Sequence, residues 1–339
     1  MGFALSVLIL KAIRRPRFVE LTKVGSTLFL CPWKRELLNR TYHEYQTISR
    51  KTQCALLALG FVKNGMDGVM NDKILDVEWL KMPKDGWFAD PFVLEVTETE
   101  IQVLIEEMPK NLHKGVITLL KIDRHSMELK SKKVVLEIPT HLSFPCILRE
   151  NGKIYIYPES AYSGRLDMYE YHPETETVSF YKTICDDVIW DSCITEKFGE
   201  KMLFTAAHND LILDIYKWND SKERFVPWRQ IPSDNKNSRM GGQLFEYGGN
   251  VYYPAQDCNS GYGAAIQIKK IDYSDGEFSF KTLKRITSPH PKMKLGLHTL
   301  NEYKGVVVID VHGYRHPIAG RIVDWMVGLK KKIKGCSIN

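Results

Sequence analysis

The sequence predicts an all-β fold, a five-bladed β-propeller, from three observations. A short phrase, in which an apolar strand carries one polar residue, recurs five times about every fifty residues, a spacing typical of propellers and solenoids. Between the phrases the chain is rich in β-branched and aromatic residues and lacks helical periodicity. Such a repeat is most simply a four-stranded sheet arranged radially around an axis. The phrases are Trp87–Phe92, His141–Cys146, Val188–Cys193, Met240–Phe245 and Gly296–Leu300.

The first four repeats each contain four segments of strand length separated by turn residues. The second repeat contains the pair Asn151-Gly152, a strong hairpin signal because both residues tolerate positive φ. The predicted strands are 87–96, 101–107, 115–122 and 133–138; then 141–149, 153–158, 165–171 and 178–184; then 188–197, 201–207, 211–218 and 225–228; and finally 242–247, 251–254, 264–271 and 278–285.

The fifth repeat supplies only two strands, Leu297–Glu302 and Gly305–Val311. We expect the two missing strands to come from upstream, from Ala55–Val62 and Ile74–Trp79. This arrangement closes the ring with both ends of the domain and removes a free sheet edge. An α/β fold is the main alternative, but it needs long amphipathic helices between the strands, which the sequence lacks.

The sequence predicts three domains: an N-terminal appendage (1–52), the propeller (53–316) and a basic amphipathic C-terminal helix (317–339). The apolar run 3–10 is too short to span a membrane, and its positive charges follow it, unlike those of a signal peptide. The helix has an apolar stripe and a lysine-rich face. Two interpretations stay open: it packs on the propeller, or it contacts an anionic membrane surface. The stripe is Ile318, Ile322, Trp325, Met326, Leu329 and Ile333.

Composition narrows the function classes. The 339 residues carry a net charge of only +6, and the aromatic residues alternate with acidic ones, so we expect no nucleic-acid partner. Seven cysteines without regular spacing form no disulfide framework. They predict a cytoplasmic protein, peripheral on the inner face of the membrane if the C-terminal helix binds lipid. No P-loop, nucleophile elbow or zinc motif is present, and the prediction is no cofactor and no metal.

If the five phrases face the axis, their polar residues and the ends of the second strands meet in one central pocket. Carboxylates and amides bind sugar hydroxyls, and two carboxylates in different environments can divide acid and base roles. The catalytic candidates are Asp90, Glu159 and Asp191. The substrate-binding candidates are Trp87, Glu107 (or its neighbour Glu106), Ser143, His208, Gln243, Asp257 and His298.

Each candidate also has a structural interpretation. Asp90 precedes Pro91, a common turn arrangement. Glu159 fits an exposed loop charge, His208 a turn, and His298 a core histidine. Asp191 is harder to explain structurally, because a carboxylate within an apolar strand needs a partner.

Six of these motifs together resemble the N-terminal domain of the glucosamine inositolphosphorylceramide transferases and their bacterial relatives, over about residues 53–315. The resemblance implies a five-bladed propeller akin to the arabinanase, levansucrase and invertase group. It also implies a role in polysaccharide assembly, at times beside formyltransferase-like domains. The motifs are Gly86–Phe92, His141–Pro145, Pro158–Ser160, Gly242–Phe245, Pro254–Cys258 with Tyr262-Gly263, and Gly296–Leu300.

The same resemblance suggests roles for three residues. In family 43 glycosidases the base is an aspartate of the first blade, which matches Asp90, and an aspartate of the third blade, which matches Asp191, tunes the acid. The acid is a glutamate of the fourth blade, where this inner strand carries Gln243. A neutral amide cannot protonate a leaving oxygen, so Glu159 is the substitute candidate, and ordinary hydrolase activity is not expected.

We therefore expect a carbohydrate-active propeller in polysaccharide or glycoconjugate biosynthesis, whose ligand is a glycan or a nucleotide- or lipid-linked sugar. The alternative is a non-catalytic glycan-binding or scaffold module for a partner glycosyltransferase or formyltransferase. Whether the protein is an enzyme stays open at this point.

Overall fold

The computed structural model describes residues 55–73, 75–81, 87–109, 112, 114–207, 211–233 and 235–314, and the backbone of two short strands nearer the N-terminus. The chain divides into two units, residues 55–321 and residues 1–54 with 322–339. In the second unit the antiparallel strands β1 (Thr22–Val24) and β2 (Thr27–Phe29) pair. The predicted C-terminal helix lies outside the described residues, as does His208; the helix and the domain boundaries stay predictions.

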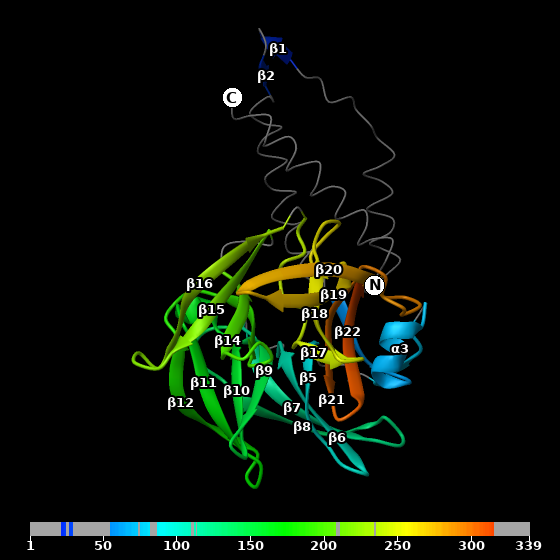
Figure 1. Ribbon diagram of the computed structural model, residues 1–339. Coiled ribbons are helices and arrows are strands. Elements are labelled where there is room, and N and C mark those ends of the chain that lie inside the picture. The colour runs from blue at the N-terminus through cyan, green and yellow to red at the C-terminus, as the bar shows by residue number, and fades with distance from the viewer. Residues whose placement is uncertain are drawn as a thin grey trace, which may run out of the picture. The chain divides into compact units, whose positions relative to one another are not determined.

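Five four-stranded antiparallel sheets confirm the predicted five-bladed propeller (Figure 1). In blades I to IV the strands follow one another along the chain and across the sheet. The strands are β5 (Phe88–Val96), β6 (Glu100–Glu107), β7 (Val116–Asp123) and β8 (Leu129–Leu136); β9 (Ser143–Glu150), β10 (Lys153–Glu159), β11 (Leu166–His172) and β12 (Thr177–Cys185); β13 (Trp190–Thr195), β14 (Met202–Ala206), β15 (Ile212–Asn219) and β16 (Arg224–Pro232); and β17 (Phe245–Tyr247), β18 (Asn250–Asp257), β19 (Ala265–Ser274) and β20 (Glu277–Ile286). A one-turn 3-10 helix (Ala161–Ser163) follows β10.

Blade V is completed from upstream, as the sequence predicts. Its order is β21 (Gly296–Tyr303), β22 (Val306–Tyr314), β3 (Ala55–Val62) and β4 (Val77–Trp79). Strand β22 pairs with β3 along its length, from Val307 opposite Val62 to Tyr314 opposite Ala55. A short helix, α3 (Gly65–Asn71), joins β3 to β4 and contacts β22, so blue and orange-red segments meet in Figure 1. Within the described residues, no helix combines the length and apolar character that crossing a bilayer requires.

The first strands of the blades surround the axis: β5 contacts both β9 and β21, and β9 contacts β13. These inner strands share an irregularity near their start. Asp90 (φ 50°), Phe144 (φ 44°) and Asp191 (φ 47°) have left-handed backbone conformations, which L-residues adopt at a cost. The ladder shifts register from Ala89 to Phe92 in blade I and from Trp190 to Cys193 in blade III. Such bulges re-aim a side chain and leave one residue unpaired.

Blade IV has a glycine at the corresponding position, near the start of its inner strand. Gly242 has a φ of 151°, and a Cβ there would lie 2.0 Å from the carbonyl oxygen of Leu300. Only glycine fits so close to a neighbouring inner strand.

Apolar side chains from facing sheets fill the space between the blades. Phe92 of blade I and Phe144 of blade II pack edge to face, with ring centroids 4.9 Å apart. Leu59 of β3 is fully buried in a cluster with Phe88 and Val308, which joins blades V and I. The closing strand therefore contributes to the core as well as to the sheet.

Replacing Leu59 by alanine tests whether ring closure stabilises the domain. We expect the free energy of unfolding to fall by about 2–5 kcal/mol, because the substitution leaves a cavity between blades V and I. Guanidinium denaturation measures it, with Glu78→Ala on the exposed face of β4 as the control. A loss below about 0.5 kcal/mol, the usual range of surface substitutions, would show that β3 is dispensable.

Candidate functional site

Charged side chains from all five blades converge where the inner strands begin. We call them the axial cluster. Blade I supplies two acids, blades II and III one each, the segment leading into blade IV an arginine, and blade V a histidine and an acid. All are buried or nearly so. The members are Asp90, Glu106, Glu159, Asp191, Arg239, His298 and Asp310.

One half of the cluster centres on His298. Its Nδ1 lies 3.0 Å from Asp90 Oδ1 and 3.3 Å from Asp310 Oδ2, and its Nε2 lies 2.8 Å from the Tyr262 hydroxyl. Burial alone would lower the pKa of His298, but Tyr262, Asp90 and Asp310 outweigh burial and raise it well above its usual range. The imidazole is therefore protonated at neutral pH and lies between two carboxylates.

The two carboxylates beside His298 differ. Burial raises the pKa of Asp90, although His298 opposes the effect. Burial also acts to raise the pKa of Asp310. There, however, the charge and hydrogen bond of His298 outweigh burial and lower the pKa. Asp310 Oδ1 also accepts hydrogen bonds from the Thr299 backbone N–H (2.7 Å) and hydroxyl (3.0 Å). Asp310 is thus the firmly ionised member.

The other half of the cluster centres on Asp191. Arg239 Nε donates to Asp191 Oδ2, which also accepts from Gln256 Nε2 at 2.9 Å. Arg239 reaches Glu159 as well, with 3.8 Å between Nη2 and Oε2. Burial and then the charge of Asp191 raise the pKa of Glu159 well above its usual range. Glu159 thus keeps its proton beside the aspartate that pairs with Arg239.

Glu106 is a second acid of this kind. Burial, and then the charge of Asp90, raises its pKa well above the usual range. Its Oε1 lies 3.3 Å from Nε2 of His141, whose own pKa is lowered by burial.

Three of the carboxyl groups also bind the backbone of the neighbouring blade. Asp310 Oδ2 accepts from the Asp90 N–H, and Asp90 Oδ2 accepts from the Phe144 N–H, both at 3.0 Å. Glu159 Oε2 likewise accepts from the Asp191 N–H at 3.0 Å. The three residues that donate these N–H groups are the inner-strand residues with left-handed backbone conformations described above.

The structure brings some of the predicted site residues together. Asp90, Glu159, Asp191 and His298 all belong to the axial cluster. Ser143 is buried at the same end, since it pairs with Glu159 in the ladder of blade II. Trp87 is half-buried directly before β5.

Three other candidates contact different groups. Gln243 lies further along the axis, where its Nε2 donates to the Ile147 carbonyl oxygen at 2.5 Å. Glu107 turns into its own blade and contacts Lys132 and the Thr118 hydroxyl. Asp257 pairs with Arg285 of blade IV at 2.7 Å.

Several members of the site escaped the sequence prediction. Asp310 interrupts the apolar run Val306–Val311 just as Asp191 interrupts its strand, so the same signal could have identified it. Arg239 stands directly before the fourth phrase. The selection of Glu107 over Glu106 depended on which face of β6 each residue occupies, and the structure places Glu106 at the cluster.

Asp90, His298 and Asp310 are also the residues that could hold a metal ion. One ligand atom from each lies within 4.8 Å of the others. A metal ligand must be deprotonated, so an ion here would first have to displace the proton of His298. The high pKa of His298 opposes that exchange.

The raised pKa of Glu159 predicts a pH dependence of stability. Above the unfolded-state pKa of about 4.3, the unfolded chain releases a proton that the folded protein retains, so stability falls as the pH rises toward the folded pKa. One such group changes the free energy of unfolding by at most about 1.4 kcal/mol per pH unit. In Glu159→Gln this fall should be shallower, measured by denaturation between about pH 4 and 8. An unchanged slope would contradict the assignment; the exposed Glu174→Gln is the control.

Replacing Asp310 by asparagine tests the charge state of His298. We expect the wild-type imidazole to remain protonated through neutral pH and its pKa to fall in Asp310→Asn, because one of two carboxylates is lost. The variant should also be less stable by about 3–5 kcal/mol, as when one partner of a buried ion pair is removed. Titration of the imidazole resonances by NMR measures the pKa, with His141 as the internal control. Neutral His298 in the wild type would refute the assignment.

Comparison with known proteins shows which family the chain matches. Residues 78–292 match the family model described as glucosamine inositolphosphorylceramide transferase 1, N-terminal. The glucosamine inositolphosphorylceramide transferase 1 of Arabidopsis thaliana is 26% identical over 197 residues, which cover 55% of this chain and 26% of the relative. That of Oryza sativa subsp. japonica is 25% identical over the same lengths. The chain thus spans about a quarter of the length of these relatives.

Among solved structures, the RS223 β-xylosidase is similar with a TM-score of 0.47 and 16% identity, over 68% of this chain and 93% of that one. A GH43_1 enzyme from Xanthomonas citri has a TM-score of 0.49 and 12% identity, over 68% and 88%. The family model matches more than half of the chain, and the chain therefore belongs to the family of the N-terminal domain of glucosamine inositolphosphorylceramide transferase 1.

Proposed function

We propose that this propeller is a carbohydrate-active domain that binds a sugar of a glycan, or of a nucleotide- or lipid-linked donor, at the axial cluster. Its role is in the assembly of a polysaccharide or glycoconjugate. The observation that carries the proposal is the convergence of acidic, basic and aromatic side chains from all five blades. Family membership supports it, because the named relatives are glucosamine inositolphosphorylceramide transferases.

The chemistry of the cluster suits a sugar. Protonated Glu159 and Glu106 both donate and accept hydrogen bonds, the carboxyl oxygens of Asp191 accept them, and Arg239 donates. Tyr262 contacts His298 through its hydroxyl, yet 55% of its surface is exposed. An aromatic ring at the rim of a polar site offers a face for the C–H surface of a sugar ring.

Catalysis is one form of this function, and the environment of Glu159 favours it. A buried carboxyl group whose raised pKa keeps it protonated can serve as a general acid. Glu159 would protonate a leaving oxygen, burial and the neighbouring Asp191 would hold it in the acid form against the opposing charge of Arg239, and Asp90 would act as base or nucleophile.

The non-catalytic alternative rests on a different observation. Asp90 and Asp191 are already engaged, with His298 and Arg239 respectively. A carboxylate in an internal ion pair is a weak base, so this pairing favours a module that binds a glycan for a partner glycosyltransferase or formyltransferase. Cytoplasmic location is part of either proposal, and it is peripheral on the membrane if residues 317–339 form a lipid-binding helix.

A screen of nucleotide sugars and oligosaccharides by thermal shift on the full chain tests the proposal. We expect a ligand to stabilise the wild type and the Asp257→Asn control, which lies outside the axial cluster. Its affinity should fall at least about tenfold, or 1.4 kcal/mol, in Asp191→Asn, because Arg239 loses its partner. Equal affinity in all three proteins, or no ligand in the screen, would refute the axial site.

The ligand so found separates the two forms of the function. An enzyme forms product with the wild type and loses turnover in Glu159→Gln while binding persists. A binding module retains the ligand in both proteins and forms no product in either.

A further inference from the structure

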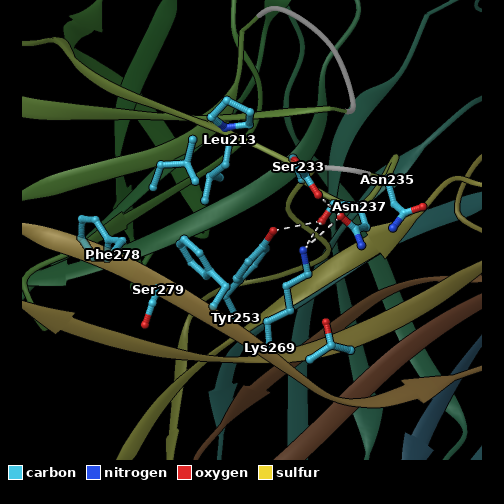
Figure 2. A pocket seen from close by; sticks show the side chains of 13 residues that line it. Leu213, Ser233, Asn235, Asn237, Tyr253, Lys269, Phe278 and Ser279 are labelled. Carbon is cyan, nitrogen blue, oxygen red and sulfur yellow. Dashed lines mark hydrogen bonds between the residues drawn. The ribbon is translucent and has the colours of Figure 1, made fainter.

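A cavity lies away from the axial cluster, between blades III and IV. It has a volume of about 300 Å³, at the lower end of cavities that hold small molecules. Leu213, Ile231, Phe278 and Phe280 form the apolar part of its wall, and side chains with hydroxyl and amide groups line the rest (Figure 2). The cavity is thus partly aromatic and partly polar.

One cationic side chain lines this cavity. Lys269 of β19 is only 7% exposed. Its Nζ donates to the backbone oxygen of Asn237 at 2.8 Å and to Asn237 Oδ1 at 3.1 Å. Figure 2 shows Lys269 and Tyr253 both directed at Asn237, and the Tyr253 hydroxyl donates to the same backbone oxygen at 3.1 Å.

Within the described part of the chain, Lys269 lacks a close counter-ion. Among the residues that the structure describes, no carboxylate oxygen lies within 4.0 Å of its Nζ. The charge of Asp257 acts to raise the pKa of Lys269, but Asp257 is itself paired with Arg285. Burial lowers the pKa of Lys269 to about 8, so the amine is still mostly charged at neutral pH.

A buried ammonium group without a counter-ion is costly, and a bound anion would remove most of that cost. The ammonium group has three N–H donors, of which Asn237 occupies two. The third donor and the charge remain for a ligand in the cavity. A bound cation would be repelled, and a neutral molecule would leave the charge uncompensated.

We propose that the cavity between blades III and IV binds a small anion carried on a sugar-sized ring, a carboxylate or a phosphate ester, with Lys269 as its counter-ion. The aromatic edge of Phe278 and Phe280 packs against the ring. The hydroxyl and amide groups of Ser233, Asn235 and Thr282 bind its polar substituents. The site is separate from the axial cluster and does not depend on the function proposed for it.

The test compares two adjacent lysines of β19. Lys269→Met keeps the length of the side chain and removes its charge. Lys270→Met is the matched control, because Lys270 is paired with Asp272 at 3.0 Å and does not line the cavity. Binding of glucuronate, glucose 6-phosphate, inorganic phosphate and neutral glucose to the full chain is measured by NMR titration.

We expect glucuronate or glucose 6-phosphate to bind the wild type and Lys270→Met, and to bind Lys269→Met at least tenfold more weakly. The two ligands distinguish a carboxylate from a phosphate ester, and inorganic phosphate alone should bind more weakly than the ring-borne anion. Undiminished affinity in Lys269→Met, glucose binding as tightly as the anions, or no binding of any probe at millimolar concentration would overturn the proposal.

A wild-type measurement decides the matter if Lys269→Met does not fold. The anion that binds should protect the Lys269 amine from acetylation, as followed by peptide mass spectrometry, and glucose should not. Equal acetylation with and without the anion would overturn the proposal.

Discussion

The ring depends on hydrogen bonds that the axial carboxylates accept from the backbone of neighbouring blades. Asp310 binds the N–H of Asp90, Asp90 that of Phe144, and Glu159 that of Asp191. Each donor has a left-handed conformation, and Asp90 and Asp191 lie where the regular ladder is interrupted. A buried N–H without a partner costs free energy. The acids at the axis are therefore first of all structural connections between blades.

This structural role explains how five carboxyl groups can be buried close together. Two of them, Glu106 and Glu159, keep their protons because burial and neighbouring charges raise their pKa values. Cationic side chains lie beside the other three, since His298 lies between two aspartates and Arg239 pairs with Asp191. Any sugar that binds here meets groups whose charges are already nearly balanced. Its recognition then depends on hydrogen bonds more than on net charge.

The sequence predicted the blades well because strand length, turn residues and the fifty-residue period are local signals. It also identified the donated strand Ala55–Val62, since a fifth repeat with two strands must be completed elsewhere. The site was harder to predict. Glu106 and Glu107 differ only in which face of β6 they occupy, and the register of a bulged ladder decides that. Asp257 looked like Asp191 in the sequence, but its partner Arg285 comes from another strand of its own blade.

Ring closure also has a consequence for synthesis of the chain. Strand β3 begins at residue 55, yet its partner β22 begins only at residue 306. At translation rates of about 5–20 residues per second, the first strand of the domain waits tens of seconds for the strand beside which it folds. During that time β3 can pair with β4 on one side, but its other side lacks the partner that β22 provides. Until β22 leaves the ribosome, one edge of β3 is therefore an open sheet edge of the kind that can pair with other chains.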